Sequence, residues 1–243
     1  MNIVAIETAT ETVGVAVRTA DGAEVSFTLH GRRRHAETLA PALEHLLAQV
    51  GLAPAGLQVV AVDIGPGLFT GLRVGVAAAK GLAQALGIGV VGVSSLDILG
   101  RAAAERGHRG RVLAAVDARR GEVFATVAQW SGSTEAAAGP AARPFLGPGL
   151  FSPGELARAL TELGGAPILG VGDGVQRYAG VLGAVAGISC VMDALGAPPP
   201  LTLLATAMDL LEAGTAPAAP QSVVPLYMRA ADATSNFARA GTT

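Results

Sequence analysis

Three short segments near the start of the chain show the hydrophobic pattern of strands. Residues 3–6 are apolar throughout, and apolar residues then recur at every second position over residues 13–17 and 25–29. Asp21 and Gly22 form a turn dipeptide between the last two segments. The pattern therefore predicts a meander of three strands.

Beyond the meander, the pattern alternates between helical and strand periodicity. Helices are expected over residues 36–50, 72–86, 95–106, 153–163, 175–182 and 201–211, and strands over residues 57–63, 90–93, 112–117, 122–128 and 168–171. Residues 131–152 show no periodicity and are expected to form a loop.

The order of these elements predicts an α/β protein with two lobes. Strands come first as a meander and then alternate with helices, and the same order repeats in reduced form after residue 106. We expect a first lobe over residues 1–106, a smaller second lobe over residues 107–215, and a tail over residues 216–243 that packs back on the body.

The amino-acid composition adds to this picture only by excluding disordered and membrane-spanning proteins. The chain is 51% hydrophobic and 15% charged, which is too apolar for a disordered protein. Its mean hydropathy of +0.48 comes largely from alanine. No stretch of about 18 residues is free of charges, prolines and glycine clusters, so no membrane span is expected.

Charge and cysteine content exclude further classes. The net charge of −2 argues against unaided binding of nucleic acid. Cys190 is the single cysteine, which excludes an internal disulfide and a cysteine zinc site. The first residues lead directly into a strand pattern without the features of a signal peptide, so a cytoplasmic location is expected.

A glycine-rich loop between a predicted strand and a predicted helix is the clearest candidate site. Such a turn can direct backbone N–H groups and the helix dipole at an anion, or it can simply allow a tight turn and close packing. Both readings stay open. Lys80 lies too far into the helix to act as a P-loop lysine. The candidate nucleotide- or anion-binding residues are Gly65, Gly67, Thr70, Gly71 and Arg73 from this segment, and Arg119 and Arg120 from the predicted hairpin at residues 117–122.

The helix after this loop carries small residues at four-residue spacing: Gly71, Gly75 and Ala79. Small side chains let another element approach closely. That element is either the chain's own sheet or a helix of a partner, and the spacing does not distinguish them.

Features needed for catalysis are missing from the sequence. After Glu7, at the end of the first strand, no glycine follows until Gly14, which argues against a phosphoryl-transfer loop. The histidines lack a second ligand at helical spacing, so no metal site is expected. The basic run at residues 32–34 reads as a solvated loop. No catalytic residue is assigned.

Five segments taken in order resemble the bacterial tRNA threonylcarbamoyladenosine biosynthesis protein TsaB (YeaZ) family. They are I-E-T-A-T at residues 6–10, H-A-E-T-L-A-P at residues 35–41, G-P-G-L-F-T-G-L-R at residues 65–73, D-A-R-R-G-E-V-F at residues 117–124 and P-L-Y-M-R at residues 225–229. The chain departs from the family's usual residues at three positions. It has Glu7 where the family has Asp, and Leu68 and Ala36 where the family has Ser. Leu68 removes a hydroxyl group from the loop and weakens the case for a bound nucleotide.

The resemblance implies a two-lobed actin-like, sugar-kinase and Hsp70-type fold with a reduced C-terminal lobe. It also implies a non-catalytic subunit of the machinery that modifies the adenosine next to the tRNA anticodon. The implied partners are a catalytic TsaD-like paralogue, a TsaE-like ATPase and, through the complex, tRNA. No cofactor of its own is expected, whereas ATP or ADP at the complex interface and a homodimer in isolation are candidate states. The alternatives are a free-standing nucleotide-binding module and a kinase- or peptidase-like enzyme.

By the same resemblance, the helices over residues 36–50 and 72–86 form the partner interface. The candidate interface residues are Leu39, Leu43, Leu46, Gly71, Gly75, Ala78, Ala79 and Leu82. We therefore expect Gly75→Leu to disrupt assembly before it disrupts folding.

Overall fold

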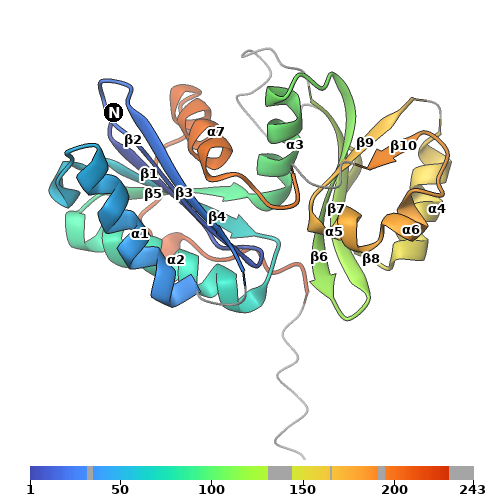
Figure 1. Cartoon of the computed structure of the whole chain (residues 1–243), viewed down its shortest axis with the longest axis horizontal. Coiled ribbons are helices and arrows are strands. Elements are labelled where there is room, and N and C mark those ends of the chain that lie inside the picture. The colour runs from blue at the N-terminus through green and yellow to red at the C-terminus, as the bar shows by residue number, and fades with distance from the viewer. Residues whose placement is uncertain (32–34, 131–143, 165, 191–194, 230–243) are drawn as a thin grey trace, which may run out of the picture.

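The strands of the computed structural model form two five-stranded mixed sheets, one in each half of the molecule (Figure 1). The structure describes residues 1–31, 35–130, 144–164, 166–190 and 195–229. The basic run at residues 32–34 lies outside these ranges.

The first sheet begins with the meander that the sequence predicts. It contains β1 (Ile3–Glu7), β2 (Thr12–Arg18), β3 (Glu24–His30), β4 (Val59–Gly65) and β5 (Gly89–Ser94). Strands β1, β2 and β3 pair antiparallel, while β4 and β5 run parallel to β1, in the order β3-β2-β1-β4-β5. Every residue of the central strand β1 is buried, because helices cover both faces of the sheet at this point.

The second sheet repeats this topology. It contains β6 (Gly110–Arg119), β7 (Glu122–Trp130), β8 (Pro144–Phe151), β9 (Ile168–Val171) and β10 (Ile188–Cys190). Strands β6, β7 and β8 form an antiparallel meander, and β9 and β10 run parallel to β6, in the order β10-β9-β6-β7-β8. Counted in chain order within each lobe, both sheets have the order third, second, first, fourth, fifth. The two-lobed fold class expected from the sequence is confirmed.

Helices cover both faces of each sheet. The helices are α1 (His35–Gln49), α2 (Phe69–Leu86), α3 (Ser95–Glu105), α4 (Pro153–Leu163), α5 (Asp173–Arg177), α6 (Ala179–Leu182) and α7 (Pro200–Glu212), with 3₁₀ turns at Pro54–Gly56 and Pro220–Ser222. Helices α1 and α2 share one face of the first sheet, and α4 to α6 lie on the outer face of the second. Helices α3 and α7 lie between the two sheets (Figure 1).

The position of α7 corrects the expected lobe assignment. The sequence placed this helix in the second lobe, but its Leu203, Leu204 and Ala207 are buried against β1, β4 and β5 of the first sheet. An Arg101–Asp209 ion pair and a hydrogen bond from the Thr202 hydroxyl to Glu105 (2.6 Å) join it to α3. The last helix of the chain therefore crosses back to complete the first lobe.

Three further expectations need correction. Part of the loop expected over residues 131–152 is the strand β8, and its other residues up to 143 lie outside the described ranges. The helix expected over residues 175–182 is two short helices, α5 and α6, that meet at Tyr178. Strand β10 was not expected, because three residues are too few to show an alternating pattern.

The tail runs along the first lobe and then reaches the second. Ala218 pairs antiparallel with Val90, and the Leu226 N–H donates to the Ile64 carbonyl (2.7 Å). Arg229 then forms an ion pair with Glu122 of β7. The segment from 217 to 229 therefore spans both lobes on one side of the molecule.

None of the helices in the described part of the chain has the length and apolar character needed to cross a membrane. Across the same residues, no three His, Cys, Asp or Glu side chains are grouped in a way that could hold a metal ion.

Candidate functional site

The glycine-rich loop packs directly against the corner between β1 and β2. The Leu68 N–H donates to the Ala9 carbonyl (2.6 Å), and the Thr8 hydroxyl donates to the Gly71 carbonyl (2.8 Å). A side chain at Gly71 would overlap the Thr8 carbonyl oxygen, and one at Gly67 would overlap that of Ala9. The absence of a side chain at these two glycines is therefore explained by packing within the chain.

This packing favours the structural reading of the loop over the ligand reading. The first residue of α2 is Phe69, and no side chain caps the helix. Thr70, one of the candidate anion-binding residues, is exposed in the first turn. The backbone N–H of Leu68, the residue before α2, already donates to the Ala9 carbonyl, so this N–H is not free to bind an anion.

Two carboxyl groups are buried beneath this corner. Glu7 ends β1 and is fully buried; one of its oxygens accepts from the Ala9 N–H (2.7 Å), and the other has no hydrogen-bond partner among the described residues. Asp63, on the neighbouring strand β4, accepts from the Gly65 N–H (2.7 Å) and the Ser95 hydroxyl (2.6 Å) through one oxygen, and its second oxygen also has no partner in the described part of the chain.

Burial controls the charge state of this pair. Loss of water raises the pKa of Glu7 well above its usual range, and the nearby Asp63 carboxylate raises it further. Burial also raises the pKa of Asp63 to about 7, against the opposing effect of its two hydrogen bonds. Both groups hold their protons more tightly than ordinary carboxylic acids, which makes a constitutively charged metal-binding pair unfavourable here.

The second lobe carries acidic residues at matching strand ends. Asp117 lies near the end of β6, and its backbone N–H donates to the Asp173 carboxylate (2.9 Å) just after β9. Burial raises the pKa of Asp173 to about 6. Arg119 contacts Asp117 (3.0 Å) and, across the lobes, Glu11 (2.6 Å). This last contact is an ion pair that joins the β1–β2 corner to the second lobe.

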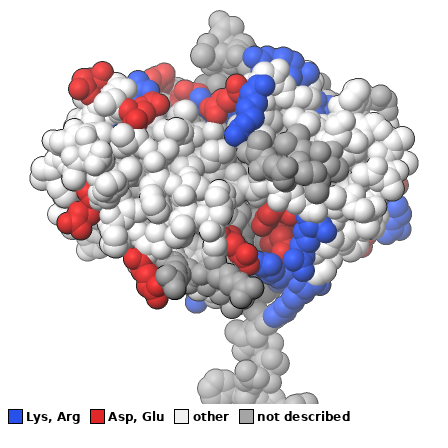
Figure 2. Space-filling view, in the orientation of Figure 1, with Lys and Arg blue, Asp and Glu red and all other residues white. Residues whose placement is uncertain are grey.

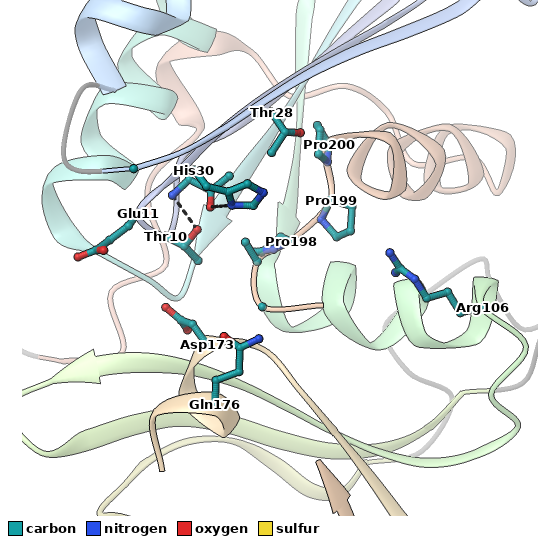
Figure 3. Close-up of a pocket in the computed structure, with 14 residues that line it drawn as sticks. Thr10, Glu11, Thr28, His30, Arg106, Asp173, Gln176, Pro198, Pro199 and Pro200 are labelled. Atoms are coloured by element: carbon teal, nitrogen blue, oxygen red, sulfur yellow. Dashed lines mark hydrogen bonds between the residues drawn. The ribbon is translucent and has the colours of Figure 1, made fainter. Parts of the chain in front are cut away.

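A cavity of about 480 Å³ opens between the lobes beside this ion pair (Figure 3). Thr10, Glu11 and His30 line it from the first lobe, and Asp173 and Gln176 line it from the second. Pro198, Pro199 and Pro200 form the wall that leads into α7. The candidate residues predicted from the sequence do not include Asp173. The signal that could have identified it is its position close to the end of the fourth strand of its lobe, since Asp63 lies near the end of β4, the fourth strand of the first lobe.

A second cavity, of about 430 Å³, brings together three segments that are far apart in the sequence. We call it the arginine groove. It is lined by Gly67, Leu68, Phe69, Leu72 and Arg73 of the loop and α2, by Ala118, Arg119, Arg120 and Phe124 of the β6–β7 hairpin, and by Leu226, Tyr227, Met228 and Arg229 of the tail. Of the predicted anion-binding residues, Gly67, Arg73, Arg119 and Arg120 meet here. The other three, Gly65, Thr70 and Gly71, do not line the groove.

Comparison with known proteins places these segments in one family. The family model described as TsaD, tRNA N6-adenosine threonylcarbamoyltransferase, matches residues 30–146. The TsaB protein of Escherichia coli K12, named for tRNA threonylcarbamoyladenosine biosynthesis, is 37% identical over 51% of this chain and 53% of its own length. An uncharacterised protein of Mycobacterium tuberculosis H37Rv is 33% identical over 83% of this chain and 78% of its own.

Solved structures agree over nearly the whole chain. YeaZ from Pseudomonas aeruginosa superposes with a TM-score of 0.74 at 26% identity, covering 93% of this chain and 100% of that one. A second structure, described as a protein with similarity to peptidase YEAZ from that organism, gives 0.79 at 27% identity, with 94% and 99% covered. The chain belongs to the TsaB/YeaZ family. It aligns with about half the length of the E. coli and Bacillus subtilis TsaB proteins.

Membership of the TsaB/YeaZ family raises the question of which face of α1 and α2 is free for a partner. Five of the predicted interface residues are buried within this chain: Leu39, Leu46, Gly71, Gly75 and Ala79. Leu43, Ala78 and Leu82 are half-buried against the same core. The stripe at residues 71, 75 and 79 faces the β1–β2 corner and the sheet, so packing within the chain accounts for its small residues. The assignment of these helices to a partner interface stays a prediction.

A second stripe of small residues on the same helix faces outward. Ala77, Gly81 and Ala85 are exposed on α2 at the same four-residue spacing, and open space surrounds Gly81. On α1, Ala40 and Ala48 are exposed. We call these five residues the α1–α2 outer face. Figure 2 shows that uncharged residues dominate the side of the first lobe turned toward the viewer.

Proposed function

We propose that this TsaB/YeaZ family member is a non-catalytic subunit required for threonylcarbamoyladenosine modification of tRNA, and that it pairs with a catalytic TsaD-like paralogue. The observation that carries the proposal is the 37% identity, over 51% of this chain, to a protein named for this biosynthesis. A TsaE-like ATPase and tRNA are its further proposed partners. ATP or ADP at the boundary between subunits stays a prediction.

The burial of the Glu7 and Asp63 carboxyl groups favours an accessory role for this chain over a catalytic one. A phosphoryl-transfer site needs charged carboxylates that hold metal ions and backbone that a phosphate can approach. In this chain Glu7 lies fully buried with a raised pKa, and the carbonyls of Thr8 and Ala9 are covered by the glycine-rich loop. A kinase-like activity of the isolated chain is therefore the less favoured alternative.

The α1–α2 outer face is the surface that we propose for the catalytic paralogue. An exposed glycine inside a helix costs about 1 kcal/mol relative to alanine, so Gly81 weakens α2 unless close approach of a neighbour compensates. Small exposed residues at positions 77, 81 and 85 would let a partner helix lie close to α2. A homodimer in isolation would use the same surface.

Gly81→Leu tests this assignment. Because open space surrounds the position, the variant is expected to fold normally but to lose the heteromeric species formed with the TsaD-like paralogue, as measured by native mass spectrometry. Gly154→Leu is the matched control, since Gly154 is also an exposed helical glycine with open space around it, on α4 of the other lobe. Normal pairing by folded Gly81→Leu would place the interface elsewhere.

Depletion of the protein in cells tests the function itself. Threonylcarbamoyladenosine in total tRNA is expected to fall sharply, as measured by mass spectrometry of digested nucleosides. The wild-type chain and Gly154→Leu should restore it, and Gly81→Leu should not. Unchanged modification after depletion would refute the proposal, and ATP turnover by the isolated chain above a mock-purified control would favour the enzyme alternative.

A further inference from the structure

The arginine groove combines exposed apolar side chains with positive charge. Phe69, Leu226 and Tyr227 line it and are 46%, 41% and 46% exposed, and they are three of the nine exposed large hydrophobic residues in the described part of the chain. The rings of Phe69 and Tyr227 lie 5.2 Å apart. Exposed apolar side chains gathered at one place and rimmed by polar groups mark an interaction site.

Four arginines surround these side chains, namely Arg73, Arg119, Arg120 and Arg229, and the described lining contains no carboxylate. The chain as a whole carries a net charge of −2, so this concentration of positive charge is local. Arg73 lies 3.7 Å from the centre of the Phe69 ring and donates through Nε to the Tyr227 hydroxyl (3.2 Å). That arrangement orients the guanidinium and leaves its terminal nitrogens for an anion.

The hairpin that supplies two of these arginines is strained. Arg119 and Arg120 have φ angles of 63° and 54°, in the left-handed region that glycine adopts without steric cost. Side chains kept at such positions point to a role for the side chain itself. For Arg119 that role includes the ion pair with Glu11 described above. Arg120 is exposed and lines the groove, so its side chain stands where a ligand would meet it.

We propose that the arginine groove binds an acidic segment of a partner protein that carries an aromatic or long aliphatic side chain. The apolar floor formed by Leu72, Phe124 and Met228 fits such a side chain, and the surrounding arginines fit flanking carboxylates. Arginine and tyrosine are also the residues that most often dominate the binding energy of protein interfaces. This surface is separate from the α1–α2 outer face, so the inference goes beyond the proposed pairing.

The neighbouring charges favour a peptide over a nucleic acid. Arg119 and Arg229 already pair with carboxylates, of Glu11 and Asp117 and of Glu122 respectively. These acids lower the net positive potential that a phosphodiester backbone needs, because binding to nucleic acid rests on several unopposed cations. A short peptide with one or two carboxylates needs less positive charge for binding than a nucleic acid does. Its apolar side chain would also contact the floor of the groove.

Selection from a library of short random peptides on the full chain tests the proposal. The selected peptides are expected to be enriched in Asp or Glu next to an aromatic or long aliphatic residue. The affinity of a selected peptide, measured by fluorescence anisotropy, should fall by about tenfold or more in Arg120→Gly and in Arg73→Gln. Arg158→Gln, an exposed arginine on α4, is the matched control and should bind as the wild type does.

Thermal unfolding followed by circular dichroism checks that the variants fold, and Arg120→Gly should fold because glycine suits its backbone angle. Either variant suffices if the other fails to fold. Selected peptides without acidic enrichment, or peptides that bind both variants like the wild type, would overturn the proposal. So would a short oligouridylate RNA that binds the same arginines more tightly than the peptide. If the groove variants lose peptide binding but still pair normally with the paralogue, the groove and the proposed pairing surface are separate sites. The two proposals can therefore fail independently.

Discussion

Replacement of Gly71 by alanine is expected to lower the free energy of unfolding by about 3 kcal/mol. The added methyl group would overlap the carbonyl oxygen of Thr8, which is backbone and cannot rotate away as a side chain could. The Thr8 hydroxyl also donates to the carbonyl of Gly71 itself, so separation of the two segments breaks this bond as well. Denaturant unfolding followed by circular dichroism measures the effect.

Replacement of glycine by alanine ten residues later in the same helix should change the free energy of unfolding in the opposite direction. Gly81→Ala places its methyl group in open space and replaces a poor helix former, so it should raise the free energy of unfolding by about 1 kcal/mol. Equal effects at the two positions would show that α2 does not press its inner face against the β1–β2 corner. By the same contact with Thr8, Gly75→Leu is now expected to disrupt folding before it disrupts assembly.

Replacement of Asp63 by asparagine is expected to stabilise the chain at pH 8 by about 2–4 kcal/mol. Burial raises the pKa of Asp63 to about 7, so the folded state binds its proton more tightly than the unfolded state does. Between about pH 4 and pH 7 the unfolded chain ionises first, and the stability of the folded chain falls as the pH rises. Asparagine removes this cost and can keep the bonds from Ser95 and Gly65 to the same oxygen.

The measurement is the free energy of unfolding as a function of pH. The wild type should lose stability from pH 4 to pH 7, because Glu7 and Asp173 also have raised pKa values and contribute with the same sign. Asp63→Asn should flatten part of this slope. Asp21→Asn is the control, because the Thr19 hydroxyl lowers the pKa of this exposed group, and its replacement should leave the downward slope in place. A wild-type profile that rises over this range would contradict the buried, protonated state.

The local pattern of the chain was sufficient for most of the framework. Alternation over residues 13–17 and 25–29 predicted β2 and β3. Ser94 caps α3 by accepting a hydrogen bond from the Leu96 N–H (3.2 Å). These features depend on neighbours within a few residues, which is the range that periodicity reports. Strand β8 escaped prediction because its prolines and glycines interrupt the alternation.

The sequence could not show which face of α2 is buried, and the reason is physical. Gly71, Gly75 and Ala79 form one four-residue stripe, and Ala77, Gly81 and Ala85 form another. Both consist of small residues, so no contrast between large apolar and polar side chains marks the inward side. Only the packing of the β1–β2 corner on α2 identifies the first stripe as buried.

By itself the sequence determined the order of most of the elements, the repeat of that order in two lobes, and the family. These follow from local periodicity and from motifs of adjacent residues. Only the tertiary structure decided that Arg73, Arg120 and Tyr227 line one groove and that Glu7 and Asp63 are buried together. The groove and the buried acidic pair depend on contacts between segments that are far apart in the sequence. Arg73 and Tyr227, for example, are 154 residues apart, and no pattern of neighbouring residues encodes such a contact.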